Sequence, residues 1–445
     1  MVAAAIPAQP RHNLLKILGV TFGVAVAVGQ MIGSGILRSP SLIAANVPGV
    51  GLIVLLWLLG AIQVSLSANI FAELATALPK SGGAYNYARR AFGDVGGLVV
   101  GWTDWLSNIA GAAAASISFA EFLPLVVPAA GAHKIAVALA LQLALYTANI
   151  AGLREGRAVQ QLTSLVKALM LLVFIVAAVI FVAPAEPSTV LANPAVWKYA
   201  DLILAYQLIM GAYAGWATPC YFTAENVAPG KAIPRALFLG ILLTAILYLG
   251  VNWALLHALG AHGVAASPLP FTVVLNRFGG AAPSILFALT AMITVASCCN
   301  ACIMAAPRIL FALASDHLLP RMLTTVNGGG SPAVAFVMTA AGTLALAASG
   351  TFALVFGLIA TLNAVAGVLT DAAFWALRWR EPLLARPYRA FGYPVLPAIP
   401  ILADASIVVL FVSADYTGGL VALAMGVLCI PFAYAAHKAR KAALA

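Results

Sequence analysis

Charged side chains are scarce in this sequence. They make up 8% of the 445 residues, 23 of them basic and 13 acidic, whereas an ordinary soluble domain has about 25%. Hydrophobic residues make up 63% of the chain, and the mean hydropathy is +1.03. So few charges do not supply the polar surface of a soluble protein, which excludes a disordered chain and nearly every soluble enzyme. We therefore expect the lipid bilayer to be the main solvent.

Cysteine and histidine are also sparse, and neither marks a reactive site. All five cysteines fall inside apolar stretches, which excludes a disulfide framework. Cys299 and Cys302 are spaced C-x-x-C, but without a second pair or a nearby histidine we interpret them as packing residues. None of the six histidines forms a catalytic motif with an acidic residue. The sequence thus predicts no catalytic residue, no metal site and no cofactor.

Long apolar runs are abundant instead. A membrane-spanning helix needs about 20 apolar residues, and the chain has twelve such stretches. They are too long and continuous for barrel strands of about ten alternating residues. The sequence therefore predicts an all-α polytopic membrane protein with twelve transmembrane helices, folded as a single domain over 1–445 because its loops are short. The predicted spans are 15–46, 50–78, 94–127, 134–151, 156–184, 198–226, 233–260, 281–314, 331–349, 351–379, 395–414 and 417–437.

The basic residues gather in alternate loops. With an even number of spans, both termini lie on one side of the membrane together with every second loop. That side holds eighteen Lys and Arg residues, and the opposite loops hold three. By the positive-inside rule, both termini are predicted to be cytoplasmic. Topology therefore explains the net charge of +10, and we expect no nucleic-acid partner.

Glycines interrupt two of the predicted spans near their middle. The first span contains Ile32-Gly33-Ser34-Gly35, and the sixth contains Gly211-Ala212-Tyr213-Ala214-Gly215-Trp216. One such motif alone favours close helix packing. Paired interruptions five spans apart are typical of the substrate site of inverted-repeat transporters. Freed N–H groups at a helix N-terminus suit a carboxylate and freed carbonyls suit an ammonium group, so the predicted ligand is a zwitterionic α-amino acid.

Further short motifs are spread over most of the chain. They are Pro79-Lys80-Ser81-Gly82-Gly83-Ala84-Tyr85, Phe92-Gly93, Gly101-Trp102, Pro234-Arg235-Ala236, Arg386-Pro387-Tyr388-Arg389 and Gly392-Tyr393-Pro394. Taken in order with the two interrupted spans, they resemble bacterial members of the amino acid–polyamine–organocation (APC) superfamily, and most closely its L-type amino acid transporter branch. The resemblance implies the leucine-transporter fold. Its five-plus-five inverted repeat would cover about 15–184 and 198–379, with discontinuous helices 1 and 6 and peripheral helices over about 395–437.

The resemblance also implies which residues bind the substrate. Amides of the Gly-Ser-Gly motif would take the carboxylate, and carbonyls of both interrupted segments would take the amino group. An aromatic gate often found in the sixth span is Gly211 here, so Gly211 either admits a larger substrate or leaves gating to Trp216 or Tyr213. The implied substrate-binding residues are Ile32, Gly33, Ser34, Gly35, Gly211, Tyr213, Ala214, Gly215 and Trp216.

Charged residues inside the spans are functional candidates, because each costs several kcal/mol in the bilayer. The resemblance implies that Lys167, in the fifth span, lies beside the first broken helix, where sodium-coupled relatives bind their ion. Lys167 is therefore predicted to be a fixed cation or a proton-coupling group, with snorkelling to the cytoplasmic interface as the alternative. Glu225 is predicted to be an inner-gate latch or a structural ion pair, and Asp371 to be structural.

Together these observations predict a secondary active transporter working by alternating access, and neither an enzyme nor a channel. The site commits no charge to a substrate side chain, which favours neutral L-amino acids, and the implied place of Lys167 favours sodium independence. The expected activity is sodium-independent exchange of neutral L-amino acids. The alternatives are a proton-coupled symporter and an antiporter of cationic amino acids or amines. We expect a multi-pass protein of the bacterial inner membrane. No cysteine falls in an outer loop, so no obligate accessory subunit is expected.

Overall fold

The computed structural model describes residues 19–47, 49–80, 82–150, 157–185, 198–327, 332–414 and 416–431. Within these ranges the chain forms fourteen α-helices and four short 3₁₀ helices, and no strand, which is the all-α class that the sequence predicts. The α-helices are α1 (Val20–Met31), α2 (Ser34–Asn46), α3 (Val50–Ala77), α4 (Ala84–Phe122), α5 (Lys134–Ile150), α6 (Arg157–Phe181), α7 (Tyr199–Tyr213), α8 (Pro229–Ala265), α9 (Pro270–Gly279), α10 (Ala281–Ser315), α11 (Ala333–Ala348), α12 (Phe352–Arg380), α13 (Val395–Ala414) and α14 (Tyr416–Val427). The 3₁₀ helices are η1 (Leu123–Leu125), η2 (Pro128–His133), η3 (Thr218–Glu225) and η4 (Arg321–Thr324).

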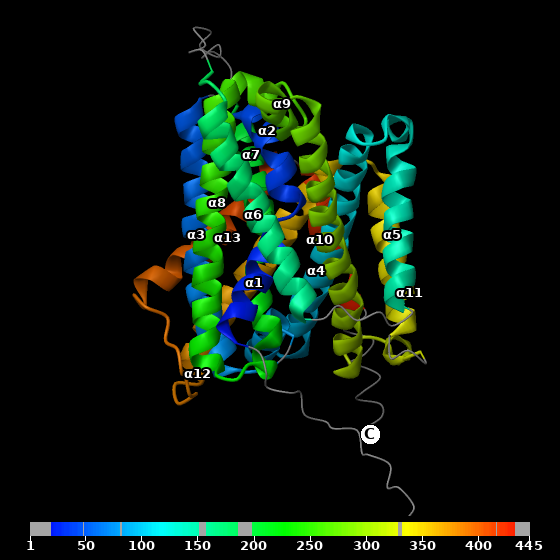
Figure 1. Cartoon of the computed structure of the whole chain (residues 1–445). Helices are drawn as coiled ribbons and strands as arrows, with labels where there is room; N and C mark the ends of the chain where they lie inside the picture. The colour runs from blue at the N-terminus through cyan, green and yellow to red at the C-terminus, as the bar shows by residue number, and fades with distance from the viewer. Residues whose placement is uncertain are drawn as a thin grey trace, which may run out of the picture.

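Eight of the described helices are long and apolar enough to cross a membrane, and α1 with α2 forms a ninth, bent candidate. Two shorter apolar helices, α11 and α14, fall below that length. The helices run largely alongside one another in a bundle, and α1 and α2 follow one another through its middle (Figure 1). The protein is therefore a polytopic helical membrane protein.

The outward faces of the bundle are apolar. On α6, for example, Leu162, Leu165, Val173 and Ile180 are all more than half exposed. In water such a surface would drive association, whereas acyl chains cover it at no cost. This explains why the outward-facing residues named on α6 are apolar.

Helices distant in the sequence pack closely inside the bundle. α4 lies against both α10 and α12, and α3 lies against α8. Small side chains make this possible, because they let helix backbones approach one another. The buried alanines of α4 include Ala110, Ala112, Ala113, Ala114 and Ala115.

Helices α4 and α9 depart from the sequence prediction in different ways. α4 begins at Ala84 rather than at residue 94, and Gly93 (φ +75°) kinks the chain near the predicted start. The segment before the kink carries Arg89 and Arg90, so its helix is too polar to be recognised as a membrane span. The sequence analysis also missed α9, a ten-residue helix within a predicted loop, because it is too short to cross a bilayer.

Candidate functional site

The first interrupted span is two helices in the structure. α1 ends at Met31, α2 begins at Ser34, and the two are bent by 42°. Ile32 (ψ 93°) and Gly33 (φ −147°, ψ −147°) leave the helical conformation between them. Among the described residues, no side chain caps the start of α2, where unpaired N–H groups and the helix dipole create a partial positive charge. The first turn of α2 is therefore a potential carboxylate-binding end.

The second interrupted span breaks beside the first. α7 ends at Tyr213, and Gly215 (φ +97°) adopts the left-handed conformation that glycine favours. Pro219 then lies in the first turn of η3. α7 packs against α2, and η3 packs against α1. A Cβ at Gly215 would lie 2.9 Å from the Cβ of Gln30, so the two breaks approach each other too closely for a larger residue.

A tyrosine hydroxyl joins the ends of both broken helices. The buried Tyr248 of α8 has its Oη atom 2.6 Å from the Met31 carbonyl oxygen and 3.0 Å from that of Ala212. The same hydroxyl group therefore lies within hydrogen-bonding distance of one carbonyl in the last turn of α1 and one carbonyl in the last turn of α7. The sequence analysis missed Tyr248, for which the only signal is a polar aromatic residue within an aliphatic span.

Lys167 lies against the first broken helix. Its side chain is 2% exposed, and its Nζ donates a hydrogen bond to the Gly29 carbonyl at 3.0 Å. The snorkelling alternative is therefore wrong, since the ammonium group stays inside the bundle. It sits at the C-terminal end of α1, where the helix dipole favours a positive charge.

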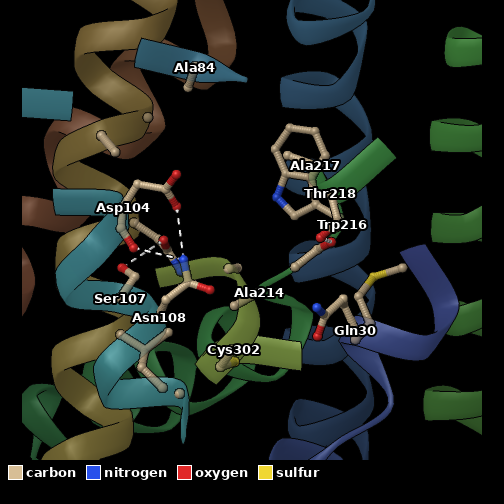
Figure 2. A pocket seen from close by; sticks show the side chains of 18 of the residues that line it. Gln30, Ala84, Asp104, Ser107, Asn108, Ala214, Trp216, Ala217, Thr218 and Cys302 are labelled. Carbon is tan, nitrogen blue, oxygen red and sulfur yellow. Dashed lines mark hydrogen bonds between the residues drawn. The ribbon is translucent and has the colours of Figure 1, made fainter. Parts of the chain in front are cut away.

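A cavity of about 840 Å³ lies between the two breaks and the helices around them. This volume is within the range of small-molecule sites. In Figure 2, Asp104, Ser107 and Asn108 of α4 form one wall, and Gln30 and Trp216 lie opposite. The cavity continues along α12 and α13 on one side and past α10 on the other. Its described lining carries four charged residues, which are Asp104, Arg308, Asp371 and Asp404.

Hydrogen bonds fix the polar wall on α4. The Tyr221 hydroxyl donates to Oδ2 of Asp104 at 2.5 Å, and the Asn108 amide donates to the Asp104 carbonyl oxygen at 2.9 Å. Ser107 donates to the Asn363 side-chain oxygen of α12 at 3.0 Å. Asn363 thus forms a helix-to-helix hydrogen bond while it also lines the cavity.

Phe356 of α12 fills the space that the small residue at Gly211 leaves open. A Cβ at Gly211 would lie 2.8 Å from Cε1 of Phe356, and a Cβ at Gly35 would lie 2.8 Å from its Cζ. One aromatic ring therefore rests on glycines of both broken helices. The sequence analysis considered Trp216 and Tyr213 for such a role and missed Phe356, which lies in a distant span.

An ion pair stands beyond the Phe356 ring. Phe356 stacks on Phe352 at 4.8 Å between ring centroids, and the Arg38 guanidinium lies over Phe352 at 5.5 Å. Arg38 donates to Glu121 of α4 at 2.8 Å, and also donates to the Pro268 carbonyl before α9. These contacts connect α2, α4 and α12 on one side of the breaks.

The predicted site residues fall into two groups. Ile32 and Tyr213 are fully buried and lie outside the cavity lining, and Tyr213 donates its hydroxyl to the Trp57 carbonyl at 3.3 Å. Their side chains therefore take no part in the described lining of the cavity. The side chain of Glu225 lies outside the described residues. The predicted residues that line the cavity are Gly33, Ser34, Gly35, Gly211, Ala214, Gly215 and Trp216.

Apolar membrane helices broken around one internal cavity are typical of secondary transporters. The profile of the amino acid permease family matches residues 18–432. The chain therefore belongs to this family of the APC superfamily, whose members are transporters and not enzymes.

Relatives of several kinds resemble the chain over most of its length. The large neutral amino acids transporter small subunit 2 of Oryctolagus cuniculus is 27% identical over 408 residues, covering 84% of this chain and 72% of the relative. The serine/threonine exchanger SteT of Bacillus subtilis (strain 168) is 29% identical over 324 residues, covering 69% and 70%. The Asc-type amino acid transporter 1 of Mus musculus is 26% identical over 411 residues, covering 86% and 74%.

Proposed function

We propose that the protein is a secondary active amino acid transporter, specifically a sodium-independent exchanger of neutral L-amino acids that works by alternating access. One observation carries the proposal. The uncapped N-terminus of α2 and the last turn of α7 meet at a single cavity. Such a junction offers donors for a carboxylate and acceptors for an ammonium group within one small volume.

In this proposal, the main chain recognises the part common to all amino acids. The N–H groups of Gly33, Ser34 and Gly35 bind the substrate carboxylate. Carbonyls at Ile32 and along the Tyr213–Gly215 stretch accept hydrogen bonds from its ammonium group. The burial of the Ile32 and Tyr213 side chains is compatible with these roles, because neither role needs a side chain.

The uncharged surroundings of the junction support a neutral substrate. Beside the breaks, the cavity is lined by Phe356, Trp216, Met210 and Cys298. We place the substrate side chain against the ring of Phe356, because that ring closes the cavity over Gly211. The exchanger activity printed in the name of one relative, the serine/threonine exchanger, agrees with exchange as the mode.

We infer that transport does not need sodium because Lys167 already supplies a cation at the end of α1. Its ammonium group takes a carbonyl of the last turn that would otherwise be available to a metal ion. The proposed role of Lys167 is that of a fixed cation, and proton coupling is the alternative if Lys167 titrates during transport.

The proposed architecture is the leucine-transporter fold in one domain with twelve spans. Spans 1–5 and 6–10 would be the inverted repeats, and α13 and α14 would be peripheral. With cytoplasmic termini, Phe356 and the Arg38–Glu121 pair lie on the outer side of the site. The cavity extends instead to Phe22 near the start of α1, to Ala84 at the start of α4 and to Gly82 just before it, which would be the inner ends of these helices. The structure would then be an inward-facing state.

We further propose that the chain functions alone in a bacterial inner membrane. All five cysteines lie within predicted spans, so none is placed to form an intermolecular disulfide in an outer loop. The printed name of one relative describes a small subunit, so purification of the expressed chain and its activity without added protein would test this point.

Uptake into proteoliposomes tests the proposed function. Vesicles containing the purified chain would be loaded with one unlabelled amino acid and given labelled alanine, leucine or arginine outside, with and without sodium and a pH gradient. We expect uptake of neutral amino acids that requires internal amino acid and ignores sodium. Uptake into empty vesicles driven by the pH gradient would instead establish proton symport. A lack of uptake of every amino acid would contradict the proposal.

A further inference from the structure

Two aspartates meet inside the bundle where α12 packs against α13. Asp371 of α12 is 0% exposed and Asp404 of α13 is 7% exposed, and both line the cavity. Gly367 lies one helical turn before Asp371, on the same face of α12. A Cβ at Gly367 would collide with Oδ2 of Asp404. The absence of a side chain at Gly367 therefore makes room for the Asp404 carboxyl group beside Asp371.

The two carboxyl groups have very different surroundings. Oδ1 of Asp404 accepts a hydrogen bond from the Gln63 amide of α3 at 2.5 Å, and the Tyr206 hydroxyl of α7 donates to Oε1 of Gln63 at 2.6 Å. Tyr206 thereby fixes the orientation that turns the Gln63 NH₂ group toward Asp404. By contrast, both carboxyl oxygens of Asp371 lack a hydrogen-bond partner among the described residues.

No described cation balances the pair. Neither carboxyl forms a salt bridge within the described part of the chain, and Arg378, two turns along α12, is paired with Glu73. Within the described part of the chain, the phenol of Tyr206 on α7 interacts electrostatically with Asp404. The remaining charged groups of the cavity lining, Asp104 and Arg308, belong to α4 and α10. Asp104 is hydrogen-bonded by Tyr221, and Arg308 donates to the Met304 carbonyl.

Electrostatics then limits the charge that this pair can carry. Burying one unpaired carboxylate is costly, and the two groups also interact electrostatically with each other. Two neighbouring buried carboxylates without a cation cannot both remain ionised, and such pairs hold a proton between them. A proton bound to either carboxyl group would also form an O–H donor, so that one of the unpartnered oxygens of Asp371 could take part in a hydrogen bond between the two side chains.

We propose that Asp371 and Asp404 form a proton-binding site that opens onto the transport cavity and holds one proton in this conformation. On release, the O–H bond of the carboxylic acid breaks, the proton passes to water in the cavity, and two carboxylates remain. Their repulsion would separate α12 from α13, so we expect proton occupancy to control the rate of transport. The existence of the site is independent of the proposed function, whereas its effect on transport rests on it.

Infrared spectroscopy of the purified full chain in lipid nanodiscs tests the site directly. We expect a carboxylic-acid carbonyl band at neutral pH that disappears in the Asp371→Asn/Asp404→Asn double variant. The Asp104→Asn variant is the matched control, because Asp104 lines the same cavity but accepts hydrogen bonds from Tyr221 and Asn108. A wild-type spectrum without the band, or an unchanged band in the double variant, would overturn the proposal.

The pH profile of amino acid uptake tests the effect on transport. Wild-type uptake should fall as the pH rises, because the fraction of protein that holds the proton falls. Where most of the protein has lost the single proton, uptake should fall by up to about tenfold per pH unit. The Asp371→Asn/Asp404→Asn double variant has no ionisable group left at the pair, so its profile should be flat. If the double variant does not fold, Asp371→Asn, which leaves Asp404 to titrate alone, should shift the profile along the pH axis. Asp201→Asn, on the first turn of α7, should keep the wild-type profile. Superimposable profiles of the wild type and of the variant tested would overturn the role in transport.

The two readouts separate the possible failures. An infrared band that behaves as expected in a protein that transports no amino acid would refute the proposed function and leave the proton site intact. Amino acid uptake by a protein without the band would refute the proton site alone.

Discussion

Gly33 provides a stringent test of the arrangement at the first break. Its φ is negative (φ −147°, ψ −147°), so alanine meets none of the left-handed strain that a positive φ would cause. The obstacle is one atom, because an added Cβ would lie 2.9 Å from Sγ of Cys298 on α10 and 3.5 Å from its Cβ. Gly33→Ala should therefore push the N-terminus of α2 away from α10, together with the amides proposed to bind the substrate carboxylate.

The size of the effect follows from this single contact. Overpacking a well-packed interior typically costs about 1–3 kcal/mol, which corresponds to about 5- to 150-fold weaker binding at 1.4 kcal/mol per factor of ten. Cys298→Ala removes Sγ and leaves only the ordinary contact with Cβ. The Gly33→Ala/Cys298→Ala double variant should therefore recover most of the lost affinity, with a coupling energy of about 1 kcal/mol or more.

Gly215→Ala is the matched control for this rescue. Gly215 has φ +97°, and its added Cβ would meet Gln30 rather than Cys298. Left-handed backbone strain of about 1–2 kcal/mol would remain whatever residue occupies position 298. The assay is equilibrium binding of labelled amino acid to purified variants, with thermal unfolding to confirm folding. Wild-type affinity in Gly33→Ala, or equal rescue of both alanine variants by Cys298→Ala, would refute this reasoning.

Three other substitutions test the residues around the breaks. Lys167→Met removes a charge-assisted hydrogen bond worth about 1.5–3 kcal/mol, so sodium-free uptake should fall about 10- to 100-fold; wild-type rates at every pH would contradict the role of Lys167. Phe356→Ala should shift the ratio of leucine to alanine uptake toward the larger substrate, because it empties the space above Gly211, and an unchanged ratio would remove Phe356 from the site. Tyr248→Phe should lower the free energy of unfolding by about 1–3 kcal/mol by leaving buried carbonyls of Met31 and Ala212 without their donor, and calorimetry or chemical denaturation in detergent would measure it.

The helix breaks could be predicted because their cause is local. Glycine lowers helix propensity wherever it stands, and the positions of Gly33 and Gly215 within long apolar runs can be read directly from the sequence. The chemistry of the breaks could be predicted for the same reason, since main-chain donors and acceptors do not depend on the neighbouring side chains. Lys167 was also recognisable, because a lysine within an apolar span needs a buried partner or a route to the surface.

The contacts between distant helices could not be predicted in this way. Phe356 and Tyr248 are ordinary aromatic residues in apolar spans, and only the packing of α12 and α8 brings them to the breaks. Asp371 was expected to be structural, and Asp404 was given no role, because nothing local shows that Gly367 lets the two carboxyl groups meet. Such contacts depend on which faces of the helices pack together. The spans are hydrophobic on nearly all faces, so their sequences do not show which face lies against another helix.

The hydrogen-bond partners of the main-chain groups at the breaks indicate which part of the site recognises which part of the substrate. Lys167 and Tyr248 donate hydrogen bonds to carbonyls at the ends of α1 and α7, whereas no side chain in the described part of the chain caps the start of α2. The unpaired donors of α2 thus form the more available half of the site, and a carboxylate is the group that satisfies them. The side chain of the substrate instead meets Phe356, which belongs to neither broken helix. Substitutions at Phe356 should therefore change which amino acid is carried, whereas those at Gly33 should weaken binding of all of them alike.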